Sequence, residues 1–410
     1  MPSRSRCLKY FCIEGEVSCL FLPQIHVKLS TNIPFHSMLS ILKEMIPSWS
    51  EFLSDSSFDE SKLVIQPMTG GITNVVYLLQ YGDNDRLIVR LYGCSTELFI
   101  NRDVENIIFS SLSKQNRAPT YYGIFNNGRI EGYISARMLT PELMYEASIY
   151  PRIATALGLF HSQHIDELDR ATVMLWDKIN SFFTVALDVM ATNSALREKA
   201  ASYNISVANM QVEMDHMMKK ISDLSEYIKS RGKGTDAYEA GAAFALDISL
   251  CHNDLLCGNI LLDNSIPTPD SSAAPTEIQT DGITFIDFEY TDYNYRGFDI
   301  ANHFCEYSGF DFDIKNKFPS KSSRIDFIRY YLRACASSEL VVQECASFYE
   351  GFDDVLCYFA LASHLYWGTW AIAQAGVSSI DFDYLFYGKQ RYEGFEHHKR
   401  LFLLNKFDFL

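Results

Sequence analysis

The pattern of apolar and polar residues over 61–140 predicts a small antiparallel lobe. From 63 to 92, β-rich runs are separated by a Gly-Gly pair and by the polar turn YGDNDR, which is typical of a strand–loop–strand–turn–strand meander. Residues 97–115 carry apolar side chains three and four positions apart, as a helix does when one face packs on a sheet. Two further short strands, TYYGIF and GRIEGYIS, are joined by an Asn-Asn-Gly turn. We therefore expect five strands and one helix in an N-terminal lobe.

The remainder of the chain reads mostly as helix. Residues 148–232 and the last third of the sequence have helical patterns, whereas the proline-rich stretch 263–282 predicts a surface loop between two strands. A mainly helical C-terminal lobe over 141–410 follows from these patterns. Residues 1–60 hold short apolar runs and prolines, and predict a poorly defined N-terminal extension with one helix near 37–53.

One apolar stretch is long enough to raise the question of a membrane span. Residues 355–377 contain no formal charge, and their number is close to the roughly 20 residues that cross a bilayer. His364 and Gln374 would be costly in lipid, however, and no basic cluster flanks the stretch. We therefore expect a buried helix of a soluble protein rather than a membrane span.

At the N-terminus, Glu14 and Glu16 interrupt the apolar run that a signal peptide needs, so no targeting sequence is expected.

Composition narrows the class of protein. With 48% hydrophobic and 14% aromatic residues, the chain of 410 residues can bury sizeable cores, and its length favours two lobes. The net charge of −16 opposes a large contact with a phosphate backbone, so nucleic acid is not an expected partner. The ten cysteines show no CxxC pair or regular spacing, which predicts a reduced cytoplasmic protein without structural disulfides or zinc.

The stretch CHNDLLCGNILLD, residues 251–263, places several polar residues in an otherwise apolar segment. Asp254 and Asn259 are five positions apart, and Asp287 ends a second apolar run. Phosphoryl transfer needs such a set: one carboxylate accepts or orients the proton of the nucleophile, and an amide and a second carboxylate hold magnesium on the phosphates. Single residues of these types are usually turn or cap residues, but the kinase spacing of the whole set favours a catalytic loop. We expect His252 to be a structural hydrogen-bonding residue rather than the base.

The predicted N-terminal lobe offers the other half of a kinase. The loop MTGGITN contains the pair Gly70 and Gly71, whose backbone N–H groups can approach phosphate oxygens, although most such pairs are simple turns. Arg90 lies in an apolar strand where protein kinases have the strand lysine, and Glu105 on the following helix can pair with it. This pair either anchors the nucleotide or only joins helix to sheet, and we favour the first.

Taken together, these residues resemble the choline/ethanolamine kinases, relatives of the aminoglycoside phosphotransferases. The motifs that carry the resemblance are GGITN, VRLYG, TELFINRD, CHNDLLCGNIL, IDFEYTDYNYRGFDIANHFCE, SHLYWGTWAI and SSIDFDYLFY. The resemblance extends from about Ile65 to His398, and residues 1–60 lie outside it. It implies an α+β, protein-kinase-like fold of two lobes. The N-terminal lobe, with an antiparallel sheet, would bind the nucleotide, and the mainly helical C-terminal lobe would carry catalysis and bind the amino alcohol.

The resemblance further implies transfer of the γ-phosphoryl group of ATP to the hydroxyl of a small amino alcohol, the first step of phospholipid headgroup synthesis. Asp254 would be the catalytic base, alongside the Arg90–Glu105 pair. The expected magnesium ligands are Asn259, Asp287 and Glu289. The expected ATP-binding residues are Gly70, Gly71, Ile72, Thr73, Asn74, Arg90, Gly132, Tyr133 and Ile134, the last three from the connector between the lobes.

The choice between amino alcohols depends on the headgroup end of the site. A quaternary ammonium is best held by aromatic faces and a carboxylate, whereas a primary ammonium requires hydrogen-bond acceptors. In the resemblance, Leu256 stands where choline kinases have a glutamine, and Asp311 stands where they have a cage tyrosine. Trp367 and Trp370 share one helical face and would form the cage, the alternative being ordinary core packing. The expected substrate residues are Asp254, Glu306, Asp311, Trp367, Trp370 and Tyr387.

We therefore expect an ethanolamine kinase that uses ATP and Mg²⁺ in the cytoplasm, at the start of the CDP-ethanolamine route to phosphatidylethanolamine. The alternatives are a choline or dual-specificity kinase, an aminoglycoside phosphotransferase, and a catalytically silent pseudokinase that serves as a scaffold. The expected partners are ATP and a small amino alcohol, without nucleic acid or a membrane span. A homodimer is left open, as are regulation and the role of the loop 263–282.

Overall fold

The structure, a computed structural model, divides into two compact units, Met1–Ser135 and Ala136–Leu410. We call them the N-terminal and the C-terminal unit, and the predicted lobe boundary near 140 lies a few residues beyond the division. The structure describes residues 35–54, 58–68, 74–82, 85–93, 96–231, 236–266, 282–309, 311–335, 345–378 and 380–403.

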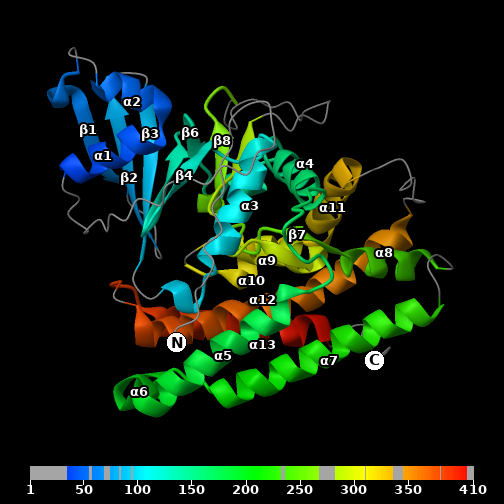
Figure 1. The fold of residues 1–410 in the computed structure, drawn as a ribbon. Coiled ribbons are helices and arrows are strands. Elements are labelled where there is room, and N and C mark those ends of the chain that lie inside the picture. The colour runs from blue at the N-terminus through cyan, green and yellow to red at the C-terminus, as the bar shows by residue number, and fades with distance from the viewer. Residues whose placement is uncertain are drawn as a thin grey trace, which may run out of the picture. The chain divides into compact units, whose positions relative to one another are not determined.

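The N-terminal unit is built on one five-stranded antiparallel sheet (Figure 1). Its order β1-β2-β3-β5-β4 is that of a meander followed by a hairpin, as the sequence predicts. The strands are β1 (Leu63–Met68), β2 (Asn74–Tyr81), β3 (Asp85–Tyr92), β4 (Tyr121–Phe125) and β5 (Gly128–Gly132).

Two helices cover one face of this sheet, where the sequence predicted a single helix near 37–53. They are α1 (Phe35–Met45) and α2 (Pro47–Ser54). Proline lacks a backbone N–H and disfavours helical geometry in the residue before it, so the helix ends ahead of Ile46 and a new one begins at Pro47. The apolar spacing of Met38, Ile41, Leu42 and Met45 buries one stripe of α1 in a core shared with the sheet. This part of the predicted extension therefore belongs to the core of the unit.

The third helix of this unit is α3 (Arg102–Lys114), inside the predicted helical segment 97–115. The side chain of Asn101 caps its first turn by accepting hydrogen bonds from the N–H groups of Asp103 and Val104. Ile108 and Leu112 lie on its buried side, one turn apart. A short 3₁₀ turn, η2 (Thr96–Leu98), precedes it.

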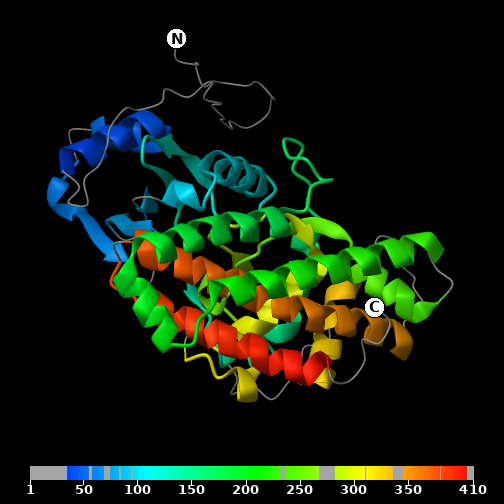
Figure 2. The same cartoon turned by 90° about the horizontal axis from the view of Figure 1, so that it is seen from below.

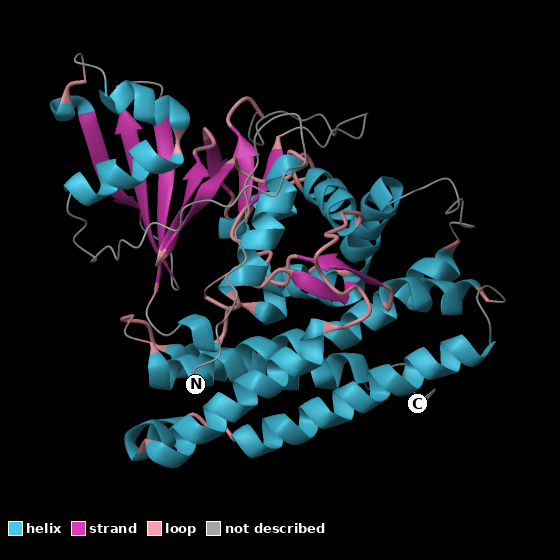
Figure 3. Cartoon of the chain, in the orientation of Figure 1, coloured by secondary structure: helices cyan, strands magenta, loops and turns pink. Residues whose placement is uncertain are grey.

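Helices dominate the C-terminal unit, as expected (Figure 3). They are α4 (Tyr150–His161), α5 (Met174–Thr192), α6 (Ser194–Ser202), α7 (Val207–Arg231), α8 (Ala237–Ala245), α9 (Arg296–Glu306), α10 (Ile314–Lys317), α11 (Lys321–Cys335), α12 (Ala346–Val377) and α13 (Tyr384–Leu403).

Helix α12 forms the centre of this unit. It packs against α5, α8, α9 and α13 (Figures 1 and 2). Almost all of its side chains from Phe348 to Gln374 are buried. Its close crossing with α8 depends on two glycines. A Cβ on Gly241 would lie 1.9 Å from the Phe348 carbonyl oxygen, and a Cβ on Gly351 would lie 2.0 Å from that of Tyr238. Among the described residues, no helix combines the length and the apolar character needed to cross a bilayer.

Two small sheets in the C-terminal unit position the polar loops of the predicted catalytic segment. Strand β7 (Ile248–Cys251) pairs with β10 (Asp292–Tyr295), and β8 (Ile260–Asp263) lies between β6 (Ala136–Met138) and β9 (Ile283–Phe285). The chain enters the loop 252–259 from β7 and leaves it through β8. Most of the predicted loop 263–282 lies outside the described residues.

Candidate active site

The loop 252–259 is held in place by helix α9. The carboxylate of Asp299 accepts hydrogen bonds from the backbone N–H groups of His252 and Asn253, each at 2.7 Å. Asn302 donates to the Asn253 carbonyl at 3.2 Å, and His303 Nδ1 lies 2.8 Å from the Leu255 carbonyl oxygen. Three side chains of one helix thus fix the loop backbone from His252 to Leu255. Within this stretch Asn253 has a φ of 63°, a left-handed conformation that asparagine tolerates.

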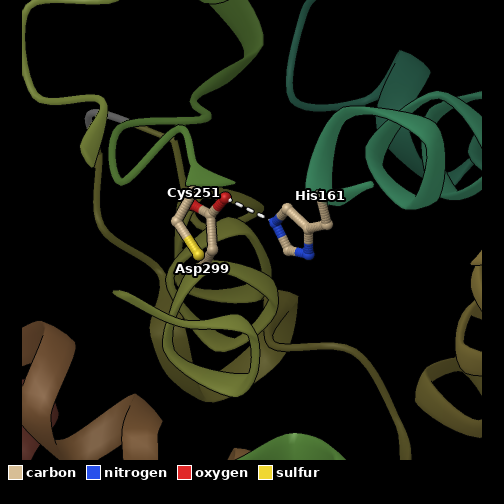
Figure 4. A group of neighbouring side chains, drawn as sticks. All are labelled: His161, Cys251 and Asp299. Carbon is tan, nitrogen blue, oxygen red and sulfur yellow. Dashed lines mark hydrogen bonds and ion pairs between the residues drawn. The ribbon is translucent and has the colours of Figure 1, made fainter. Parts of the chain in front are cut away.

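Asp299 also joins a group that has the composition of a metal site. His161 Nε2 lies 2.9 Å from its Oδ2, and Cys251 lies beside it (Figure 4). The carboxylate is already committed to the loop N–H groups, and His161 Nδ1 lies 2.7 Å from the Tyr331 hydroxyl. Burial raises the pKa of Cys251 far above its usual value and lowers the pKa of His161, so thiol and neutral imidazole prevail. We therefore interpret the group as a structural hydrogen-bond relay under the loop.

Asp254 and Asn259 lie together at the two ends of a short turn. The Asn259 side-chain amide donates to the Asp254 carbonyl at 2.8 Å and to its carboxylate Oδ2 at 3.2 Å. Burial raises the pKa of Asp254 well above its usual value, and the nearby negative charges of Glu306, Asp287 and Glu289 raise it further. The sequence spacing therefore corresponds to a real cluster of an amide and carboxylates in the C-terminal unit.

Strand pairing brings Asp287 close to Asp254 and Asn259. Asn259 directly precedes β8 and Ile286 directly follows β9, and the Ile286 N–H donates to the Asn259 carbonyl at 3.0 Å. Asp287 then adopts a φ of 67°, a left-handed conformation that is uncommon outside glycine and tends to occur at functional positions. Glu289, two residues later, is buried.

The donor set fits a hard divalent cation. Magnesium prefers oxygen ligands, which Asn259, Asp287 and Glu289 can supply. The electrostatic strain that neighbouring carboxylates impose on Asp254 is also what a bound cation would relieve. We therefore keep these three residues as proposed magnesium ligands.

The histidine at the start of the loop, His252, is a buried hydrogen-bonding residue. His252 is fully buried and its Nε2 lies 2.9 Å from the Ile286 carbonyl oxygen, which agrees with the structural role expected from the sequence. Burial lowers the pKa of His252, so the ring is neutral near pH 7. A neutral ring in this position links the catalytic loop to the segment that carries Asp287.

Replacing His303 with glutamine should make the protein less sensitive to acid. Burial lowers the pKa of His303 to about 4, although the Leu255 carbonyl and Asp299 act in the opposite direction. The unfolded chain, with a histidine pKa of about 6.5, binds the proton more tightly than the folded state. The contribution of neutral His303 to the free energy of unfolding is therefore fully present above pH 6.5. It falls by about 3 kcal/mol as the pH decreases toward 4.

Glutamine can still donate to the Leu255 carbonyl but cannot titrate. Urea unfolding at pH 7 and pH 5 should show a smaller loss of unfolding free energy in His303→Gln than in the wild type. An equal loss in both proteins would show that His303 does not contribute to acid sensitivity.

The headgroup residues predicted on α12 and α13 lie in one aromatic group. The rings of Trp367 and Trp370 have centroids 5.4 Å apart, and Tyr387 lies 6.4 Å from Trp370, both pairs being edge-to-face. Each indole N–H has a partner: Trp367 donates to Asn302 Oδ1 and Trp370 to the Tyr290 hydroxyl, both at 2.8 Å. Both tryptophans are almost fully buried, so packing is part of their role whatever else they do.

Glu306 and Asp311 have different surroundings. Glu306, the last residue of α9, is close enough to Asp254 and Tyr387 to raise the pKa of each, after the larger effect of burial. Asp311 is exposed, and its backbone carbonyl accepts a hydrogen bond from Gln390 at 3.3 Å. The ring of the next residue, Phe312, lies 6.4 Å from Tyr387 instead. The structure therefore brings Glu306 to the aromatic group but leaves the Asp311 side chain outside it.

In the N-terminal unit, charged side chains form a buried chain of ion pairs. Arg90 Nε donates to Glu131 Oε1 at 2.8 Å, and Arg129 Nε donates to the same atom at 2.7 Å. Arg129 Nη1 also donates to Glu105, whose second oxygen accepts from Arg102 at 2.7 Å. The predicted partners Arg90 and Glu105 thus belong to one chain, in which Glu131 and Arg129 form the links.

These carboxylates remain ionised despite their burial. Burial alone would raise the pKa of Glu131, but Arg90 and Arg129 outweigh it and lower the pKa to about 2. In Glu105 the same conflict is decided by Arg129 and Arg102, which hold its pKa below the usual value. These ion pairs are therefore a fixed array of full charges inside the N-terminal unit.

The sequence reading missed Arg129 and Glu131. They alternate with Ile130 in the strand GRIEG, and Ile130 belongs to the core under α1 and α2. Side chains two apart on a strand share one face, so Arg129 and Glu131 lie on the opposite face. Two opposite charges at that spacing in a short, otherwise apolar strand were a signal that could have revealed them.

The other expected nucleotide residues are placed in part. Asn74 begins β2, is buried, and accepts a hydrogen bond from Arg102 at 3.0 Å. Gly132 ends β5, Tyr133 lies under the Arg86 guanidinium, and Ile134 is half-buried. Gly70, Gly71, Ile72 and Thr73 lie outside the described residues.

An antiparallel sheet unit followed by a helical unit that carries an aspartate–asparagine loop is the arrangement of the protein-kinase-like fold. Comparison with solved structures supports this fold. A choline kinase from Cryptosporidium parvum superposes with a TM-score of 0.67 at 24% identity, covering 90% of this chain and 96% of that one.

The sequence comparisons identify the family. The choline/ethanolamine kinase family model matches residues 65–396. A probable ethanolamine kinase from Arabidopsis thaliana is 32% identical over 93% of this chain and 91% of its own length. A probable ethanolamine kinase A from Dictyostelium discoideum is 34% identical over 85% of this chain and 88% of its own length. The chain therefore belongs to the choline/ethanolamine kinase family.

Proposed function

We propose that this protein transfers the γ-phosphoryl group of ATP to the hydroxyl of ethanolamine, giving phosphoethanolamine and ADP. The observation that carries the proposal is the cluster of Asp254, Asn259 and Asp287 on adjoining turns of the C-terminal unit. Its support from relatives is the match to two proteins named ethanolamine kinase over most of their length.

In the proposed reaction the substrate oxygen attacks the γ-phosphorus as the bond from that phosphorus to the ADP oxygen breaks. The hydroxyl proton moves to the Asp254 carboxylate, which the Asn259 amide orients. Magnesium, when bound, would neutralise the charge that develops on the phosphate oxygens. Asn259, Asp287 and Glu289 are the residues we assign to hold it.

We assign nucleotide binding to the N-terminal unit. The buried chain that includes Arg90 and Glu105 supplies fixed charge, and a preorganised charge stabilises a transition state without reorganising during the reaction. Gly70, Gly71, Ile72, Thr73 and Asn74 are proposed to hold phosphates, and Gly132, Tyr133 and Ile134 to line the adenine end.

The preference for ethanolamine is supported by the acceptor at the headgroup end. Glu306 offers a carboxylate near Asp254, which suits an ammonium with three N–H donors. Leu256 stands two residues after Asp254, where choline kinases have a glutamine in the family resemblance. Asp311, which was expected to replace a cage tyrosine, is exposed and gives the preference no support.

A choline kinase or a dual-specificity enzyme is the second candidate. The observation in its favour is the edge-to-face group of Trp367, Trp370 and Tyr387, since aromatic faces are what a quaternary ammonium requires. The family model covers both activities.

Comparing kcat/KM for ethanolamine and choline at saturating ATP and magnesium should show a preference for ethanolamine. A difference of about tenfold corresponds to a single hydrogen bond to a charged group. Mono- and dimethylethanolamine should give intermediate values, because each methyl group removes one N–H donor. A tenfold preference for choline would reject the substrate assignment. If neither phosphoethanolamine nor phosphocholine were formed, a catalytically silent scaffold would be favoured.

A further inference from the structure

Arg391 is a fully buried cation beside the proposed headgroup site, and the functions proposed above give it no role. It lies on α13, one turn after Tyr387, so both side chains share a face of the helix. Its guanidinium carbon lies 5.1 Å from the centre of the Phe312 ring and 5.7 Å from that of Tyr387. A buried arginine is costly unless it is paired, which makes its partners informative.

One partner is Glu306. Arg391 Nη1 donates to Glu306 Oε1 at 3.0 Å, with 1% of the arginine side chain and 15% of the glutamate side chain exposed. Glu306 is the last residue of α9, where the partial negative charge of a helix end disfavours a carboxylate. Arg391 offsets that charge and fixes one carboxylate oxygen, while the residual exposure leaves Glu306 within reach of a ligand.

The second partner connects Arg391 to the catalytic loop. Its Nη2 donates to the Ser363 hydroxyl at 3.3 Å, and Ser363 donates to Asn302 Oδ1 at 2.8 Å. The same Asn302 oxygen accepts the Trp367 indole N–H, and its amide donates to the Asn253 carbonyl. A continuous chain of buried hydrogen bonds thus runs from Glu306 through Arg391 to the loop that carries Asp254.

We propose that Arg391 is a positioning residue for the amino-alcohol ammonium, acting through Glu306 and Tyr387. It holds one Glu306 oxygen so that the carboxylate is presented to the substrate in a fixed direction, and it packs against the Tyr387 ring. The inference rests on the proposed function, because it assumes that an amino alcohol binds between these groups and Asp254.

The expected effect is selective for one substrate. A carboxylate in a fixed direction matters most to an ammonium that donates N–H bonds, and less to a quaternary ammonium that responds mainly to charge. The loop itself is held independently by Asp299 and His303, so turnover at saturation should change little. A KM effect confined to the amino alcohol is therefore the signature of the role.

The test compares Arg391→Met and Arg391→Lys with the wild type. In Arg391→Met the KM for ethanolamine should rise about ten- to a hundredfold, the loss expected for a hydrogen bond to a charged group, while kcat and the KM for ATP change less than about threefold. Arg391→Lys keeps the charge but cannot contact Glu306 and Ser363 together, so an intermediate KM is expected. The KM for choline should rise less than that for ethanolamine.

A matched control separates positioning from general destabilisation. Arg324 is also a buried arginine of this unit, paired with Asp353 at 2.6 and 2.8 Å through two nitrogens. Arg324→Lys should lower the thermal midpoint without changing either KM. In a Glu306→Gln background, Arg391→Lys should have little further effect on the KM for ethanolamine, because the carboxylate that Arg391 fixes has been removed.

The outcomes distinguish the two levels of the proposal. A wild-type protein that phosphorylates neither amino alcohol would reject the proposed function itself. An active wild type, together with an unchanged KM for ethanolamine in both folded Arg391 variants, would reject only the role of Arg391. Equal KM effects in Arg324→Lys, or full additivity with Glu306→Gln, would likewise reduce Arg391 to a stabilising residue.

Discussion

Replacing Asp254 with alanine should lower kcat by about 10²- to 10⁴-fold, the range expected when a general base is removed. The carboxylate is half-buried, oriented by Asn259 at 3.2 Å, and surrounded by other negative charges that raise its pKa after the larger effect of burial. A base with a raised pKa accepts a proton more readily than an ordinary aspartate. Initial rates at saturating ethanolamine, ATP and magnesium measure the effect.

Asp254→Asn provides the control for folding. Because the folded protein raises the pKa of Asp254, the ionised carboxylate is destabilising at pH 7, and the neutral amide should increase the thermal midpoint measured without ligands. The same variant should be as inactive as Asp254→Ala. Wild-type turnover in either variant would remove Asp254 from the role of base.

Asp299→Asn should lower both stability and turnover. The buried carboxylate accepts hydrogen bonds from His252 N–H, Asn253 N–H and His161 Nε2, between 2.7 and 2.9 Å. An amide has one oxygen, and its NH₂ group would face a donor, so we expect a loss of about 3–5 kcal/mol in unfolding free energy. The loop would lose the support that fixes Asp254, and kcat of the folded enzyme should fall at least about tenfold.

Asp353→Asn is the matched control for this variant. Asp353 is equally buried, but its carboxylate accepts hydrogen bonds from Arg324 of α11 and not from the loop 252–259. Urea unfolding should report a comparable loss of stability for both variants, whereas only Asp299→Asn should reduce the kcat of the folded fraction. Equal kcat values in the two variants would mean that Asp299 supports the fold and not the loop.

The sequence was most informative where function requires residues close together along the chain. Asp254 and Asn259 belong to one turn, so their spacing alone placed them together, and β8–β9 pairing then brought Asp287 beside them. Asp299 lies in the motif RGFDIANHF, which carries the family resemblance but gives no local sign of this role. Its role depends on the approach of α9 to the loop, which no local pattern encodes.

Where the structure differs in detail from the sequence expectations, the differences have a common physical cause. The Arg90–Glu105 hypothesis followed an analogy between distant positions, whereas the buried charges are shared among neighbouring strands and α3 through Glu131 and Arg129. The expectation for Asp311 depended on counting through a turn after α9, where one residue decides which side chain faces inward; Phe312 does so. A helix was expected near 37–53, but its place in the core was not, because the partner of its apolar stripe is a sheet formed by residues farther along the chain.

Helix α9 has a further consequence for the range of alcohols that the protein can accept. Its middle residues fix the backbone around Asp254, and its last residue is Glu306. A helix is a stiff rod that advances about 1.5 Å per residue. The distance between the proposed proton acceptor, Asp254, and the proposed ammonium acceptor, Glu306, is therefore fixed by this helix. Changes in nitrogen methylation can be accommodated by residues of α12 and α13, but a longer carbon spacer would require this rod itself to move.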